Sequence, residues 1–169
     1  MISTELLRRY PFFEGFTDRH LRTIARLSDE VRIEPHTILF RPDDRPNSFL
    51  ILTKGQISLF LCVPDRLAEP PTPGAQLIGD IPGERITVES VMMAGSVLCW
   101  SALVPPHETT CGAVTTTECE LIRIEAVELE AIFEEDPSFG YLMMKKLAIV
   151  IHERLHSRRL EDLWSLSSP

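Results

Sequence analysis

Apolar residues recur at helical spacing near the start of the chain. From Leu21 onward they lie three or four positions apart within residues 19–27, which is the period of one face of an α-helix. Thr17 and Asp18 precede this stretch, and both residue types cap helix N-termini. We therefore predict N-terminal helices within residues 1–28, including one amphipathic helix over 19–27.

The pattern changes to short strands from Asp29 onward. Runs rich in β-branched and aromatic residues are separated by Pro, Asp, Asn and Gly, which is typical of strands joined by turns. These runs cover residues 31–33, 37–40, 48–52, 56–63, 85–92, 95–98, 111–117 and 119–124. About eight strands predict a mainly β fold with flanking helices, a double-stranded β-helix or jelly roll over residues 29–125.

Two connections between these strands have distinct compositions. Lys54-Gly55 is typical of a tight turn between two strands. Residues 64–83 hold five prolines and three glycines, so we predict a loop or mobile insertion there.

The C-terminal part, residues 126–169, is predicted to be helical. A helix over 126–136 is followed by Asp136-Pro137, a capping residue and a proline that together start a second, long helix. Apolar side chains between 139 and 151 cover more than one face of that helix, so we expect two packing partners. One is the β-roll and the other a second copy of the chain, giving a homodimer. A possible seam repeats every seven residues at Leu142, Ile149, His156 and Leu163. The alternative is that the wide apolar face only covers the roll.

Length and charge limit the function classes. A chain of 169 residues with 44% apolar content can bury one core, so we predict a single domain over residues 1–169. A net charge of −8 argues against a nucleic-acid partner. There is no apolar run long enough for a membrane span and no long apolar segment of a signal peptide, so we expect a cytoplasmic protein.

The four cysteines do not have the spacing of a metal-binding or redox motif. They lie in or beside apolar runs, which suits reduced thiols better than disulfides. They are Cys62, Cys99, Cys111 and Cys119.

Three segments of the chain, in this order, resemble the cyclic-nucleotide-binding domain family, which includes the catabolite activator protein and the regulatory subunit of protein kinase A. They are PFFEGFTDRHLRTIARL, ILFRPDDRPNSFLILTKG and GSVLCWSALVPPHETTCGAVTTTECELIRI. The resemblance covers about residues 11–160. It departs from the family at Asp43-Asp44, where Gly-Asp or Gly-Glu is usual. The resemblance implies a regulatory ligand-binding module without catalytic activity.

The third segment aligns with the family's phosphate-binding cassette, with Ala102 and Leu103 on the family's Ala-Leu. The resemblance implies that a glutamate before them would accept a hydrogen bond from the ribose and that a later arginine would pair with the cyclic phosphate. Here Trp100 stands at the glutamate position and Thr109 at the arginine position, while Cys99 replaces a glycine. A buried phosphate without a cationic partner costs several kcal/mol. We therefore expect no binding of cAMP or cGMP in the usual pose.

Two interpretations of this altered cassette remain open. In the first, Trp100 fills the vacated pocket and the chain is a ligand-free scaffold or protein-interaction module. In the second, an unknown small molecule with an apolar or stacking surface binds there, because an indole offers a large flat face. The candidate pocket consists of Cys99, Trp100, Ser101, Ala102, Leu103, Thr109 and Thr110. The expected role is a stand-alone sensor; a truncated transcription regulator of the catabolite activator type is a further alternative.

A different motif points to an enzyme. His152-Glu153-Arg154-Leu155-His156 matches H-E-x-x-H, in which two histidines bind zinc and the glutamate acts as general base. A catalytic zinc needs a third protein ligand, and no motif downstream supplies one. A zinc hydrolase is therefore only a remote alternative, and His152 and His156 are weak metal candidates.

No cofactor is predicted from the sequence. Relatives of this fold carry haem or an iron–sulfur cluster, but the N-terminal cysteine group of the cluster-binding type is missing. A haem would need an axial ligand such as His107, Cys99 or His36, and the sequence neither excludes nor supports it.

Overall fold

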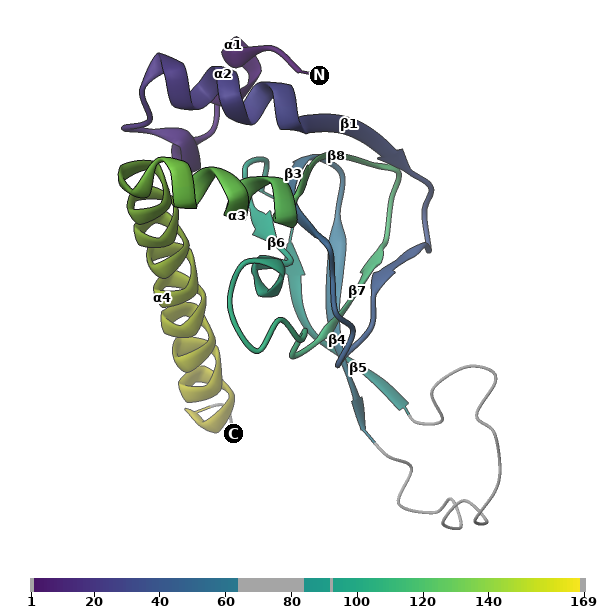
Figure 1. Cartoon of the computed structure of the whole chain (residues 1–169). Coiled ribbons are helices and arrows are strands. Elements are labelled where there is room, and N and C mark those ends of the chain that lie inside the picture. Colours follow the sequence, from purple (N-terminus) through teal and green to yellow (C-terminus); the bar gives the residue numbers. More distant parts are fainter. Residues whose placement is uncertain (1, 64–83, 92, 168–169) are drawn as a thin grey trace, which may run out of the picture. The chain divides into compact units, whose positions relative to one another are not determined.

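The computed structural model describes residues 2–63, 84–91 and 93–167, with side chains for 2–62, 93–157 and 159 (Figure 1). The described residues form two compact units. One unit is Glu30–Arg123, and the other joins Met1–Asp29 to Ile124–Pro169. The predicted limits of the β-roll, 29 and 125, lie within two residues of these limits. That the whole chain forms one domain stays a prediction, and the predicted loop at 64–83 lies outside the described residues.

The unit Glu30–Arg123 is built from two four-stranded sheets. Their orders are β1-β8-β3-β6 and β2-β7-β4-β5, so consecutive strands are distributed between the sheets as in a jelly roll. The predicted mainly β fold with flanking helices is confirmed. The strands are β1 (Ser28–Ile33), β2 (Ile38–Phe40), β3 (Ser48–Lys54), β4 (Ile57–Val63), β5 (Glu84–Val91), β6 (Val97–Leu98), β7 (Gly112–Thr115) and β8 (Cys119–Glu125).

The core of the roll takes side chains from both sheets. Leu52 and Leu121 come from one sheet, and Ile57 and Ala113 come from the other. Alternation of inward and outward residues along each strand brings these side chains together. The cluster consists of Phe40, Leu52, Ile57, Leu59, Leu98, Cys99, Ala113, Cys119 and Leu121.

The predicted turn at Lys54-Gly55 joins β3 to β4. Gly55 has φ +97°, in the left-handed region that L side chains rarely adopt. A Cβ atom added there would lie 2.4 Å from the backbone carbonyl oxygen of Glu118. Both the dihedral angle and the close backbone therefore require glycine at this turn.

The second unit is helical, as the sequence predicts for both ends of the chain. The Thr17 hydroxyl accepts a hydrogen bond from the backbone N–H of His20 at 3.2 Å, which confirms the predicted cap. The elements are α1 (Thr4–Arg8), η1 (Pro11–Phe13), α2 (Asp18–Leu27), α3 (Ala126–Glu135) and α4 (Pro137–Ser167). Within the described part of the chain, no helix has both the length and the apolar character needed to cross a bilayer.

Aromatic rings hold the helices of this unit together. Phe139, at the start of α4, contacts the ring of Phe16 at 5.7 Å and that of Phe133 at 5.5 Å between centroids. It also stacks on the imidazole of His20 at 4.9 Å. Only 1% of Phe139 is exposed, so this side chain joins residues before α2, in α2 and in α3 into one core.

Asp136 marks the junction of α3 and α4. Its carboxylate accepts hydrogen bonds from the Ser138 hydroxyl at 2.6 Å and the Phe139 backbone N–H at 3.2 Å. The imidazole Nε2 of His20 lies 3.4 Å from the other carboxylate oxygen. These three partners lower the pKa of Asp136 below its ordinary value of 3.8, the Ser138 hydrogen bond contributing most. The ionised form therefore caps α4, as the Asp136-Pro137 pattern predicts.

Asp136→Ala is expected to lower the melting temperature at neutral pH, because α4 loses its cap. The pKa of Asp136 is lower in the folded state than in the unfolded state, so its stabilisation is complete well above pH 3.8 and is lost as the pH falls through the folded-state pKa. The melting-temperature difference between wild type and variant should therefore shrink in acid. A difference that stays constant down to about pH 2 would contradict a capping role for the ionised carboxylate.

Candidate functional site

The segment that the sequence identifies as the candidate site connects β6 to β7. Cys99 follows β6 with φ +61°, and the 3₁₀ turn η2 (Trp100–Ala102) comes next. Two hydrogen bonds close the turn, from the Ala102 N–H to the Cys99 carbonyl at 3.1 Å and from the Leu103 N–H to the Trp100 carbonyl at 2.9 Å. The left-handed backbone at Cys99 is a conformation that glycine adopts readily. This conformation explains why the family resemblance predicts a glycine at the position of Cys99.

The seven predicted pocket residues differ in exposure. Four of them, Cys99, Ala102, Leu103 and Thr109, are buried. Trp100 and Ser101 are half-buried, while Thr110 is exposed. The structure thus places most of the segment in or near the interior of the roll, whereas Thr110 faces outward.

Thr109 is tied to the loop between β2 and β3. Its hydroxyl donates to the Arg41 carbonyl at 2.5 Å and lies 3.2 Å from the Asp44 carbonyl. Its backbone N–H donates to the Asp44 carbonyl at 2.9 Å, and its carbonyl accepts from the Asp43 N–H at 2.8 Å. Only 3% of Thr109 is exposed. Thr109, where the family resemblance predicts an arginine, therefore links two segments of the roll.

Thr109→Val is expected to lower the free energy of unfolding by about 1–2 kcal/mol, because it keeps the shape of a buried side chain and removes its hydrogen bond to the Arg41 carbonyl. Thr110→Val is the matched control. Its exposed position predicts a change within about 0.5 kcal/mol. Urea denaturation of both variants measures the difference, and equal stabilities would contradict the role of the Thr109 hydroxyl.

The loop that Thr109 holds departs from the family at Asp43. This residue has φ +65°, again a dihedral angle that favours glycine and that Asp tolerates better than most residues. The Asp44 carboxylate accepts a hydrogen bond from the Arg41 backbone N–H at 2.7 Å and so closes the loop. The Asp43-Asp44 departure is visible in the sequence, but no local pattern reveals that this loop is the partner of Thr109.

An ion pair lies beside this link. The Arg45 guanidinium donates to one carboxylate oxygen of Glu108 from Nε at 3.2 Å and from Nη2 at 2.7 Å. Both side chains are partly exposed. The positive charge of Arg45 is thus paired with the negative charge of Glu108, the residue before Thr109.

Cys99 is a neutral thiol in this setting. Burial raises its pKa from the ordinary 9.0 to about 12, with smaller contributions from Cys111 and Asp44. Since the thiolate is the metal ligand and nucleophile, Cys99 is a poor haem ligand. Among the described residues no two cysteines form a disulfide bond.

Alkylation is expected to spare Cys99 in the folded protein. At pH 8 a thiol with this pKa is about one part in ten thousand thiolate, and its side chain is buried as well. Half-buried Cys62 should react first with iodoacetamide, and Cys99 only after unfolding. Peptide mass spectrometry reads out each site; labelling of native Cys99 at the rate of Cys62 would contradict this description.

The two histidines considered as haem ligands take part in turns. The Nδ1 atom of His107 lies 3.2 Å from the Ala102 carbonyl, and its backbone N–H donates to Val104. His36 is exposed, and its backbone N–H donates to the Thr115 carbonyl at 2.7 Å. These contacts give both residues structural roles and add no support for a haem site.

His152 and His156 lie one turn apart on α4, and both are exposed. Their rings are 6.4 Å apart between centroids and within 6° of parallel. Among the residues whose placement is described, no group of three or more His, Cys, Asp or Glu side chains lies close enough to hold a metal ion. The third ligand that a catalytic zinc requires is therefore not found in this part of the chain.

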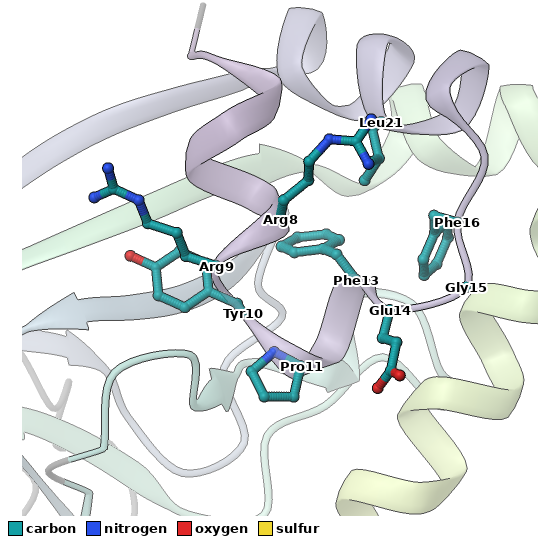
Figure 2. Close-up of a pocket in the computed structure, with 9 residues that line it drawn as sticks. All are labelled: Arg8, Arg9, Tyr10, Pro11, Phe13, Glu14, Gly15, Phe16 and Leu21. Carbon is teal, nitrogen blue, oxygen red and sulfur yellow. The ribbon is translucent and has the colours of Figure 1, made fainter.

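Among the described residues, hollows are found in the helical unit. One, of about 390 Å³, is bounded by residues 8–11, 13–16 and Leu21. In Figure 2 the Arg9 guanidinium and the Glu14 carboxylate lie at opposite sides of it, so these charges do not converge on one point. The other, of about 280 Å³, lies beside His20 and Asp136. Neither hollow is lined by the predicted pocket residues.

Comparison with known proteins assigns the chain to a family. Residues 30–136 match the family model of the cyclic nucleotide-binding domain. Among curated proteins none matches the chain.

Three solved structures illustrate the likeness. A protein of Geobacter metallireducens described as cyclic nucleotide-binding is 26% identical, with a TM-score of 0.73 over 92% of this chain and 100% of that chain. The catabolite activator protein of Thermus thermophilus is 19% identical, with a TM-score of 0.63 over 92% of this chain and 63% of that one. The regulatory domain of Toxoplasma gondii PKA, solved with cAMP, is 20% identical, with a TM-score of 0.58 over 76% and 42%.

The match spans more than half of the chain and includes the segment from Cys99 to Thr110 and helix α3, so the family resemblance seen in the sequence is confirmed. This chain belongs to the cyclic nucleotide-binding domain family.

Proposed function

We propose that the chain is a sensor module that does not bind cAMP or cGMP in the usual pose and responds to a different, uncharged ligand. The family assignment supports a regulatory ligand-binding role. The residues at the two cassette positions, Trp100 and Thr109, support the change of ligand.

The observation that carries the proposal is the bonding of Thr109. An anionic phosphate buried in this region needs a cation or several donors to replace its water. The Thr109 hydroxyl already donates to the Arg41 carbonyl. Arg45, which lies in the same loop, is paired with Glu108. A phosphate that took the Thr109 hydroxyl or the Arg45 guanidinium as a partner would first have to break these contacts.

The predicted pocket residues favour a neutral, flat ligand. Cys99 stays protonated at neutral pH, and the other six predicted pocket residues carry no charge. The half-buried Trp100 offers an indole face for stacking, and Ser101 beside it offers a hydroxyl. This combination suits an uncharged aromatic or heteroaromatic metabolite better than a nucleotide.

The signal would pass to the C-terminal helices. Asp136 and Pro137 separate α3 from α4, and a change of angle at this junction would move the whole of α4. The exposed apolar residues of α4 favour its pairing with a second copy of the chain. Of the predicted seam, Leu142 is half-buried and Ile149 and His156 are exposed, while the side chain of Leu163 lies outside the described residues. Ligand binding would then change the geometry of a homodimer.

A thermal-shift screen tests the proposal. The panel contains cAMP, cGMP, cyclic dinucleotides and uncharged aromatic metabolites, because a ligand that binds only the folded state raises the melting temperature. We expect a shift with a neutral aromatic compound and a loss of that shift in Trp100→Leu. A shift with cAMP or cGMP would overturn the proposal, and silence across a broad panel would favour the scaffold interpretation.

A further inference from the structure

The two histidines of α4 form an accessible pair of metal donors that the proposed sensor function does not use. They are four residues apart, so their side chains project from the same face one turn from each other. The rings of His152 and His156 are nearly parallel, and neither is buried. Helical His pairs at this spacing are suited to chelate one metal ion between them.

Glu153 does not share this face. Successive helical residues differ by about 100° around the axis, so the glutamate projects about 100° away from His152. It is therefore not a third ligand on the face of the two imidazoles, and its position is the one that a general base takes in H-E-x-x-H sites. The hydrolase interpretation of H-E-x-x-H lacks a third ligand among the described residues.

The histidine pair lies in an exposed, partly apolar strip of α4. At about 100° per residue, the members of this strip fall within roughly 60° of the direction of His152. The apolar side chains among them are accessible: Tyr141 is 70%, Ile149 45% and Leu155 49% exposed. The strip consists of Tyr141, Lys145, Ala148, Ile149, His152, Leu155, His156 and Arg159, all of them exposed.

One strip supplies only half of a metal site. Zinc in proteins takes four ligands in a tetrahedron, and imidazole nitrogen suits it. Within the described residues no third donor joins the pair. A second copy of α4, packed on the apolar residues of the same strip, would bring two more imidazoles and complete the set with no other donor required.

We propose that His152 and His156 bind a divalent transition-metal ion, with Zn²⁺ as the tetrahedral case, together with the same pair of a second copy of the chain. One ion then serves two chains, and metal binding stabilises the homodimer. The inference rests on the proposed pairing of α4 and adds a ligand that controls it. Because the ion binds only where two strips meet, it shifts the equilibrium toward the dimer.

Sedimentation velocity of the full chain, in EDTA and in increasing Zn²⁺, tests this proposal. We expect the dimer dissociation constant to fall about tenfold or more with zinc, and saturation at one ion for two chains. His156→Ala should remove the zinc response. The matched control is His156→Ala combined with Ser157→His, which keeps the number of histidines but turns one of them by about 100° around the helix. It should also fail to respond.

Other outcomes separate this inference from the proposed sensor function. An equal dimer dissociation constant in EDTA and in zinc would leave the pairing of α4 intact and overturn the metal site. Saturation at one ion per chain without dimer formation would overturn the shared site. An unchanged zinc response in the variant with the relocated histidine would also overturn it. None of these results affects the Trp100-dependent thermal shift, which tests the sensor proposal by itself.

Discussion

Phe139→Ala is expected to lower the free energy of unfolding of the helical unit by about 3–5 kcal/mol. The ring is almost fully buried and contacts Phe16, Phe133 and His20, so its removal leaves a cavity among three elements. These contacts also fix the start of α4. Urea denaturation followed by helical circular dichroism measures the loss.

Tyr141→Ala provides the control for that measurement. Tyr141 is an aromatic residue two positions further along the same helix, but 70% of it is exposed. Its replacement should change the stability by no more than about 0.5 kcal/mol. Similar losses for the two variants would contradict the assignment of Phe139 as the centre of the helical core.

Gly55→Ala is expected to lower the free energy of unfolding of the β-roll by about 3 kcal/mol or more. Two effects add up here. An alanine at φ +97° costs about 1–2 kcal/mol in backbone strain. Its Cβ would also lie 2.4 Å from the Glu118 carbonyl oxygen, which belongs to the backbone and must move together with the start of β8.

Gly15→Ala separates the two effects. Gly15 has φ +88°, close to that of Gly55, but an added Cβ there meets nothing within 4 Å. Its replacement should therefore cost only the strain of about 1–2 kcal/mol. If thermal denaturation shows equal losses for the two alanine variants, the close approach of Glu118 does not constrain the turn.

The strands could be predicted from the sequence because their pattern is local. In residues 119–124, for instance, apolar and polar positions alternate in the way that predicts strand β8. Gly55 likewise predicts the turn before β4, although the sequence does not show which residue lies close to it. The capping pairs Thr17-Asp18 and Asp136-Pro137 likewise fixed the starts of α2 and α4. In these cases the residues that determine the element lie within or next to it.

Other features depend on residues far apart in the chain. The link from Thr109 to Arg41 joins residues 68 positions apart. The family resemblance predicts an arginine at the position of Thr109, but the sequence gives no sign that the threonine hydroxyl is bonded. Only the pairing of the strands brings the two segments together.

At two positions the sequence has another residue where the family resemblance expects glycine, and the backbone conformation explains that expectation. Asp43 and Cys99 stand at positions where the family resemblance expects glycine, and both have a left-handed backbone. The backbone conformation typical of glycine is thus kept while the side chains differ. This pattern favours an altered pocket on an intact scaffold over random loss of the cassette.

Isothermal titration of the whole chain with cAMP tests the central claim most directly. Because Thr109 is bonded within the roll and Arg45 is paired with Glu108, we predict no saturable heat at ligand concentrations up to about 1 mM, which corresponds to a binding free energy weaker than about −4 kcal/mol. Stoichiometric binding with a dissociation constant of about 10 μM or below would contradict the claim and restore the chain to the cyclic-nucleotide-responsive members of its family.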